Sequence, residues 1–140
     1  MAFDFVVPAL VGLLPVGSFL AALLYLDSYK LVKLNAVIAI VVSGAVVAGS
    51  CYLVNSWAMG LLGIDLIPFS RYVSPIIEEA LKGLVIVGLI QAHRIGFLVD
   101  AAIFGFAVGT GFALVENLYF LELVSDAGIG TWIVRGFGTA

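Results

Sequence analysis

The sequence predicts an all-α protein, a polytopic bundle of transmembrane helices with four full spans and the start of a fifth. Of its 140 residues, 64% are hydrophobic and 11% are charged, whereas soluble domains carry roughly a quarter charged residues. Four apolar stretches are long enough to cross a bilayer, which takes about 20 residues. Too few polar residues remain to cover a soluble core, so we expect residues 1–140 to form a single membrane-embedded domain.

The first two predicted spans lie close together in the chain. The first runs from about Phe5 to Leu26 and the second from about Leu34 to Val54. Asp4, not a basic residue, precedes the first span, which we therefore interpret as a retained helix and not as a signal peptide. The looser stretch from Asn55 to Tyr72 contains glycines and a proline. We predict that it is a loop lying along the membrane interface, a zone that suits its aromatic residues.

The later spans have clearer boundaries. Ser74 is a candidate N-cap and Pro75 suits a first helical turn, so we expect the third span to run from there to Gln91. The fourth runs from about Phe97 to Leu123, and a fifth apolar stretch opens at Thr131 and stops at Ala140. We therefore expect the chain to be an N-terminal portion of a longer protein.

The distribution of charge between connections predicts the orientation. Basic residues gather in the first and third connections, at Lys30, Lys33 and Arg94. The other side is mainly acidic, with Asp4, Asp65, Glu122 and Asp126 against Arg71 alone. The positive-inside rule then places the basic connections in the cytoplasm and the N-terminus outside. The predicted location is the cell membrane, with several passes.

Charge and cysteine content exclude two other classes of feature. The formal net charge of −3 argues against a basic nucleic-acid-binding surface. Cys51 is the single cysteine, so an intramolecular disulfide is impossible.

Ionisable residues inside the predicted spans are the strongest functional signal. The third span carries Glu78, Glu79 and Lys82, the fourth carries Asp100 and Glu116, and the fifth carries Arg135. A charged side chain at mid-membrane costs roughly 2.5–3.5 kcal/mol on insertion scales, and such residues mark functional sites by default. Glu78 and Glu116 fall roughly 6 and 10 Å inside the outer ends of their helices, given a rise of about 1.5 Å per residue. We therefore expect one polar site in the outer half of the membrane.

Structural explanations for these residues remain open. Lys82 has a partner for an ion pair in either Glu79 or Glu78, and Glu116 alone would suit an interhelical hydrogen bond. For Asp100 the favoured explanation is structural, as a partner of Arg94 near the interface. The small-xxx-small motif Gly105–Gly109 favours internal packing that brings Glu116 toward the third span. A proton- or ion-coupled carrier is a further alternative, although carriers favour midplane sites and inverted repeats.

Two motifs on adjacent spans resemble a known family. Glu78-Glu79-Ala-Leu-Lys82 has the form EExxK, and Phe112-Ala-Leu-Val-Glu116-Asn117 has the form FxxxEN. Their order and spacing resemble the PrsW family of intramembrane proteases, which is distantly similar to the CAAX prenyl protease and bacteriocin-processing group. The resemblance covers roughly residues 72–140.

The resemblance implies hydrolysis of peptide bonds within or beside the membrane, in substrates such as a single-span anti-sigma factor. It implies that Glu78 or Glu79 activates water as general base, and that Lys82 keeps a carboxylate ionised or stabilises developing negative charge. Glu79 and Glu116 are the candidate ligands of a divalent metal such as zinc. Phe112, Asn117 and Arg135 complete the set of site residues.

The resemblance also implies a histidine on a later helix, beyond Ala140. We therefore expect an incomplete metal site and no activity from these 140 residues alone. The expected partners are a membrane-protein or peptide substrate and the lipid bilayer, without nucleic acid. A non-catalytic membrane protein of the same fold, such as an immunity or scaffold factor, is the main alternative. The expected geometry has Glu78, Glu79 and Glu116 facing one another across the contact between the third and fourth spans.

Overall fold

A computed structural model describes residues 2–26, 32–123 and 129–138, and every regular element in these ranges is helical. The elements are α1 (Ala2–Leu26), α2 (Leu34–Leu62), α3 (Leu66–Pro68), a π-helical turn η1 (Phe69–Val73), α4 (Ser74–Gln91), α5 (Leu98–Leu123) and α6 (Ile129–Gly138). The predicted connections at Lys30 and at residues 125–128 lie outside the described residues. The predicted all-α class is confirmed.

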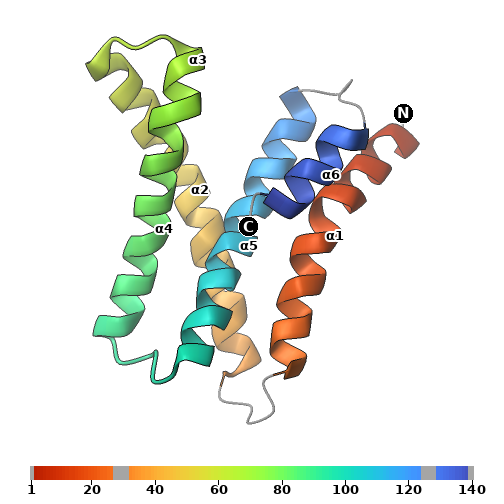
Figure 1. The fold of residues 1–140 in the computed structure, drawn as a ribbon, viewed down its shortest axis with the longest axis vertical. Coiled ribbons are helices and arrows are strands. Elements are labelled where there is room, and N and C mark those ends of the chain that lie inside the picture. Colours follow the sequence, from red (N-terminus) through yellow and green to blue (C-terminus); the bar gives the residue numbers. More distant parts are fainter. Residues whose placement is uncertain (1, 27–31, 124–128, 139–140) are drawn as a thin grey trace.

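The long helices run up and down in alternation (Figure 1). The N-terminus, the connection between α2 and α3, and α6 lie at one end of the bundle. The connection between α4 and α5 lies at the other end, with the start of α2. Lys33 and Arg94 therefore share an end opposite to Asp65, as their positions in the predicted connections require.

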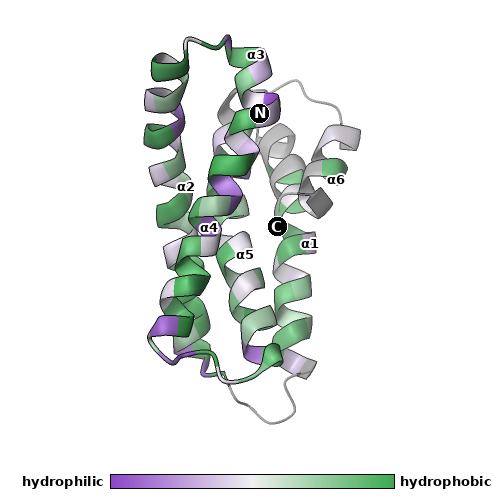
Figure 2. Ribbon diagram, turned by 60° about the vertical axis from the view of Figure 1, so that its left-hand side comes forward, coloured by the Kyte–Doolittle hydropathy of each residue, from purple (hydrophilic) through white to green (hydrophobic). Residues whose placement is uncertain are grey.

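Large hydrophobic side chains make up much of the outer surface of the bundle. Large hydrophobic side chains such as Leu53, Trp57, Ile76 and Leu84 are each more than 60% exposed. Hydrophobic residues cover most of the length of the helices in Figure 2. Within the described residues, Leu34–Leu62 and Leu98–Leu121 are long and apolar enough to cross a membrane. Two of the predicted spans are therefore supported by length and hydropathy.

The core lies between α2 and α5, which make the most extensive helix contact. Val37 and Ile40 on α2 pack there against Ile103, Phe104 and Val108 of α5. Apolar burial at this crossing fixes the position of α5 relative to α2. The same crossing therefore determines where the polar residues further along both helices lie.

Two glycines permit the close crossing of α2 and α5. A Cβ atom built on Gly111 would overlap the backbone carbonyl of Val41, and one built on Gly44 would overlap that of Val108. Small residues that allow backbones to approach are typical of membrane helix contacts. The prediction for Gly105 is wrong, since a Cβ there would meet nothing within 4 Å. The close contact is made toward α2, through Gly111, and not toward the third span.

The predicted interfacial loop from Asn55 to Tyr72 is largely helical, which corrects the sequence prediction. Helix α2 continues through Asn55 to Leu62 and ends at Gly63, whose φ of 62° is left-handed. Its N–H donates to the Met59 carbonyl at 3.0 Å. Glycine adopts this conformation without steric cost, so it is a common helix stop. The polar and glycine residues before it do not end the helix because tertiary contacts outweigh weak local propensity.

A π-helical turn joins α3 to α4 and replaces the predicted N-cap. Pro75 lacks an N–H to donate to the carbonyl of Arg71, so the regular hydrogen-bond ladder cannot continue through this point. Phe69–Val73 adopts the wider turn there, and the chain enters α4 already helical. Ser74 is therefore no N-cap: it is the first residue of α4, whose N-cap position is Val73, and its hydroxyl bonds to a side chain in α4.

Helix α6 packs on α1 at the end of the bundle that also holds the N-terminus (Figure 1). Pro15 leaves the carbonyl of Val11 without its usual helical donor, and Gly136 packs against that carbonyl and the Pro15 ring. Arg135 therefore lies on a helix that contacts α1, although its side chain is outside the described residues.

Asp100 is structural, but its partners differ from those predicted. Its Oδ2 accepts the backbone N–H groups of Gly96 and Phe97, both at 3.0 Å. A carboxylate in the first turn that bonds back to preceding amides stabilises a helix start. The expected pairing with Arg94 is wrong, since Oδ2 bonds to these two amides and the buried Oδ1 has no hydrogen-bond partner among the described residues. Asp100 therefore stabilises the first turn of α5 and lies apart from Glu78 and Glu116.

Candidate active site

A cavity of about 530 Å³ lies between α2, α4 and α5. Its walls are mostly apolar, and the acidic groups in them come from two helices. The lining residues include Gly49, Asn55, Glu78, Phe112, Glu116 and Tyr119. The cavity thus brings together the first glutamate of EExxK with the phenylalanine and glutamate of FxxxEN.

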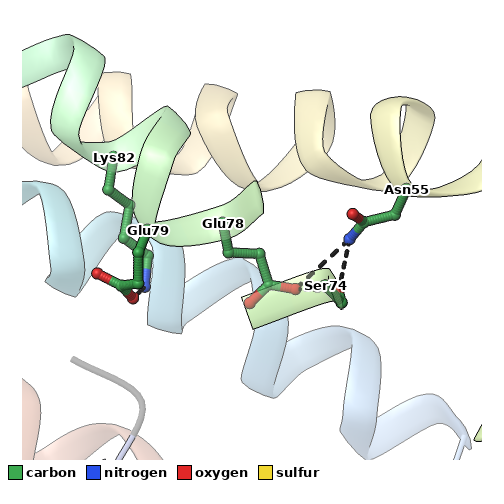
Figure 3. Close-up of polar contacts among 5 residues, drawn as sticks. All are labelled: Asn55, Ser74, Glu78, Glu79 and Lys82. Atoms are coloured by element: carbon green, nitrogen blue, oxygen red, sulfur yellow. Dashed lines mark hydrogen bonds and ion pairs between the residues drawn. The ribbon is translucent and has the colours of Figure 1, made fainter. Parts of the chain in front are cut away.

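Glu78 reaches this cavity from the second turn of α4, where hydrogen bonds hold it. The hydroxyl of Ser74 donates to Glu78 Oε1 at 2.6 Å. Asn55 Nδ2, from α2, donates to Ser74 Oγ at 2.7 Å and lies 3.5 Å from Glu78 Oε1. Figure 3 shows the three side chains meeting between the two helices. Both bonds end on Oε1, and within the described part of the chain Oε2 has no hydrogen-bond donor.

Glu79 points in another direction from Glu78 (Figure 3). Adjacent residues on a helix are about 100° apart around its axis, so one cannot follow the other into the same space. The side chain of Glu79 is 74% exposed and pairs with Lys82, whose Nζ lies 2.9 Å from Glu79 Oε1. Glu79 is not among the residues that line the cavity. The expectation that both glutamates face Glu116 is therefore met only by Glu78.

Lys82 is the better enclosed member of the pair, at 15% exposure. Its Nζ lies 4.0 Å from the centroid of the Phe112 ring, within the range of a cation–π contact. Phe112 in turn lines the cavity. Lys82 therefore brings a positive charge to the edge of the cavity while its carboxylate partner stays outside.

The two polar residues of FxxxEN separate in the same way. Glu116 is partly buried and lines the cavity. Asn117, at 1% exposure, points toward α1, where its Nδ2 donates to the Gly12 carbonyl at 3.2 Å. Asn117 thus links α5 to α1, while Glu116 lies in the wall of the cavity.

The sequence comparison agrees with this geometry. The profile described as PrsW family intramembrane metalloprotease matches residues 33–140, which include both motifs and every helix that lines the cavity. The chain belongs to this family. It is therefore an intramembrane peptidase located in a membrane. No curated protein matches the chain, and no solved structure matches it.

The described residues of this PrsW-family protein do not form a complete metal site. Among them, no group of three or more His, Cys, Asp and Glu side chains is placed to hold a metal ion. A catalytic zinc site usually has three protein ligands, and the cavity offers the two carboxylates of Glu78 and Glu116. The proposed ligand pair of Glu79 and Glu116 is not brought together, since Glu79 lies outside the cavity.

Two residues of the site, Asn55 and Ser74, are not predicted from the sequence of this PrsW-family protein. The sequence predicts a loop at Asn55, which follows an apolar run, and a helix N-cap at Ser74. The available signal was the spacing of Ser74 and Glu78, which are four residues apart and so share a helix face. Nothing in the sequence alone indicates that Asn55 faces them, because that contact depends on how α2 and α4 pack.

Proposed function

We propose that this chain carries the general base of peptide-bond hydrolysis in the cavity between α2, α4 and α5, and that the base is Glu78. The observation that carries the proposal is that Glu78 and Glu116, from separate motifs and separate helices, line one mostly apolar cavity. Buried carboxylates are unfavourable in a membrane unless they have partners or a task. The cavity gives both residues access to water and to a peptide.

The arrangement around Glu78 suits proton transfer. Its Oε1 is held by donors, so Oε2 is the oxygen that takes a proton from a water molecule. As the proton moves, the water oxygen bonds to the carbonyl carbon of the substrate amide. Glu78 then returns the proton to the departing amine. A positioned base of this kind typically contributes about 100- to 10,000-fold in rate.

Lys82 and Glu116 have supporting roles in this proposal. Negative charge develops on the amide oxygen during attack and needs a cation or donor nearby. Lys82, held against Phe112 at the cavity edge, is the cation available for this role. Glu116 lies on the α5 wall and helps to bind the attacking water, or a divalent metal together with groups outside the described residues. Glu79 acts through Lys82, by holding its ammonium group.

We further propose that α1 and α4 cross the membrane with α2 and α5, and that α6 begins a fifth span. In support, α1 and α4 run beside the two apolar spans over most of their length (Figure 1), and α4 is almost entirely apolar apart from its three charged residues. Lys33 and Arg94 would face the cytoplasm and the N-terminus the outside. The cavity residues then lie toward the outer face, where a single-span membrane protein such as an anti-sigma factor is the proposed substrate.

Reconstitution of the full-length protein with a single-span model substrate tests the proposal. We expect cleavage by the wild-type protein and its loss in Glu78→Gln and Glu116→Gln, with folding retained. Glutamine keeps the shape of glutamate and removes its charge and basicity. A folded wild-type protein that binds the substrate and leaves it intact would instead favour a non-catalytic protein of the same fold.

A further inference from the structure

An asparagine outside both motifs contacts the proposed base across the helix interface. Asn55 lies on α2, and its Nδ2 is 2.7 Å from Ser74 Oγ and 3.5 Å from Glu78 Oε1. Ser74 Oγ is itself 2.6 Å from Glu78 Oε1. The three side chains form one continuous chain of hydrogen bonds from α2 to α4 (Figure 3).

The chemistry of these groups sets the direction of the hydrogen bonds. An amide nitrogen only donates, whereas a hydroxyl can accept one bond and donate another. Ser74 therefore accepts from Asn55 and donates to Glu78. The opposite orientation of the Asn55 amide would turn its carbonyl oxygen toward the Glu78 carboxylate, which places two acceptors against each other. The amide nitrogen thus faces the carboxylate because only that orientation gives the carboxylate a donor from Asn55.

We infer that Asn55 is a positioning residue for the reaction, which fixes Glu78 through Ser74 so that Oε2 faces the attacking water. Oε1 receives two donors, and the carboxylate plane cannot rotate without breaking both bonds. Asn55 Oδ1 is buried and has no hydrogen-bond partner in the described structure. An unsatisfied buried acceptor is unfavourable for folding, so a contribution to stability does not by itself explain an asparagine at this position. The inference rests on the proposed role of Glu78.

The test uses the full-length protein in liposomes and a fluorescence-quenched peptide that carries an apolar membrane-spanning segment. We expect Asn55→Ala to lower kcat by about 10- to 100-fold, because small losses of alignment at a reacting group have effects of this size. KM should change by less than about twofold, since Asn55 acts on the base and not on substrate binding. Asn35→Ala is the matched control, because Asn35 is an exposed asparagine at the other end of α2.

Ser74 supplies a second, independent pair of variants. Ser74→Ala removes the hydroxyl that links Asn55 to Glu78 and should lower kcat to the same extent as Asn55→Ala. Ser74→Thr keeps a hydroxyl and should have a kcat close to that of the wild-type protein. The double variant Asn55→Ala/Ser74→Ala should have the same kcat as either single variant, because each substitution breaks the same chain of hydrogen bonds. The infrared carboxylate band of Glu78, isolated by subtraction of the Glu78→Gln spectrum, should shift in Asn55→Ala and not in Asn35→Ala.

The outcomes separate this inference from the proposed function. Wild-type kcat in Asn55→Ala, with Glu78→Gln inactive, would overturn the positioning role and leave the base in place. Wild-type kcat in Glu78→Gln would overturn the base assignment itself. If Asn55→Ala does not fold, the serine variants decide the matter: equal kcat for Ser74→Ala and Ser74→Thr overturns the inference, and a loss confined to Ser74→Ala supports it.

Discussion

The ammonium group of Lys82 lies 4.0 Å from the centroid of the Phe112 ring, so the last residue of EExxK rests on the first residue of FxxxEN. Lys82 also pairs with Glu79 at 2.9 Å. The two motifs are therefore joined by a cation held between a carboxylate and an aromatic ring. This contact sets the relative position of α4 and α5 at the level of the cavity.

The contact between Lys82 and Phe112 should be measurable as a coupling energy. A cation–π contact contributes about 0.5–2 kcal/mol, depending on how far it is shielded from water. We expect a double-mutant cycle of Lys82→Met and Phe112→Leu to give a coupling of about 0.5–1 kcal/mol, measured by reversible unfolding in detergent micelles. The same cycle with Phe104→Leu should show no coupling, because Phe104 packs in the α2–α5 core. Equal coupling energies in both cycles would show that Lys82 has no specific interaction with the Phe112 ring.

The crossing of α2 and α5 gives a prediction about packing. We expect Gly111→Ala to destabilise the protein by about 1–3 kcal/mol, the usual range for overpacking, because the added methyl group would overlap the Val41 carbonyl. Gly105→Ala should be neutral or slightly stabilising, since it has open space and alanine favours helix. Thermal unfolding in the same detergent compares the two. Equal melting temperatures for both variants would show that the close crossing is absent.

Much of this fold follows from hydropathy, and the site follows only in part. The starts of α2 and α4, the end of α1 and the limits of α5 agree with the apolar runs to within a residue or so. The sequence predicts a loop at Asn55–Leu62, where the structure has helix, because polar residues and glycines inside a membrane helix resemble the beginning of a loop. Periodicity implies that Glu78 and Glu79 diverge. Which of them faces the cavity depends on where α2 packs, and no local pattern contains that information.

The cavity gives a prediction about substrate access. Gly49 lines it, and a Cβ at this position would meet nothing within 4 Å. We expect Gly49→Leu to fill part of the cavity and to raise KM for the quenched membrane-spanning peptide, with little change in stability. Gly83→Leu on α4 is the control, since that glycine is also unhindered and is not among the lining residues. Similar KM values for Gly49→Leu and the wild-type protein would mean that the substrate binds elsewhere.

The proposed orientation predicts the accessibility of engineered cysteines. In a Cys51→Ala background, we expect Asp65→Cys to react with a membrane-impermeant maleimide added outside intact cells. Arg94→Cys should react only after the membrane is opened. Both native side chains are exposed and lie at opposite ends of the bundle, so each label reports one side. Labelling of position 94 but not of position 65 in intact cells would reverse the orientation.

The paired glutamates provide the most direct test of the central claim, because they are adjacent in sequence and differ in surroundings. Glu78 lines the cavity and is bonded to Ser74, whereas Glu79 is 74% exposed and bonded to Lys82. The measurement is kcat for cleavage of a single-span substrate by full-length Glu78→Gln and Glu79→Gln proteins that unfold at the same temperature. The account predicts a loss of at least about 100-fold in Glu78→Gln and a smaller loss in Glu79→Gln. Near wild-type cleavage by Glu78→Gln would contradict it.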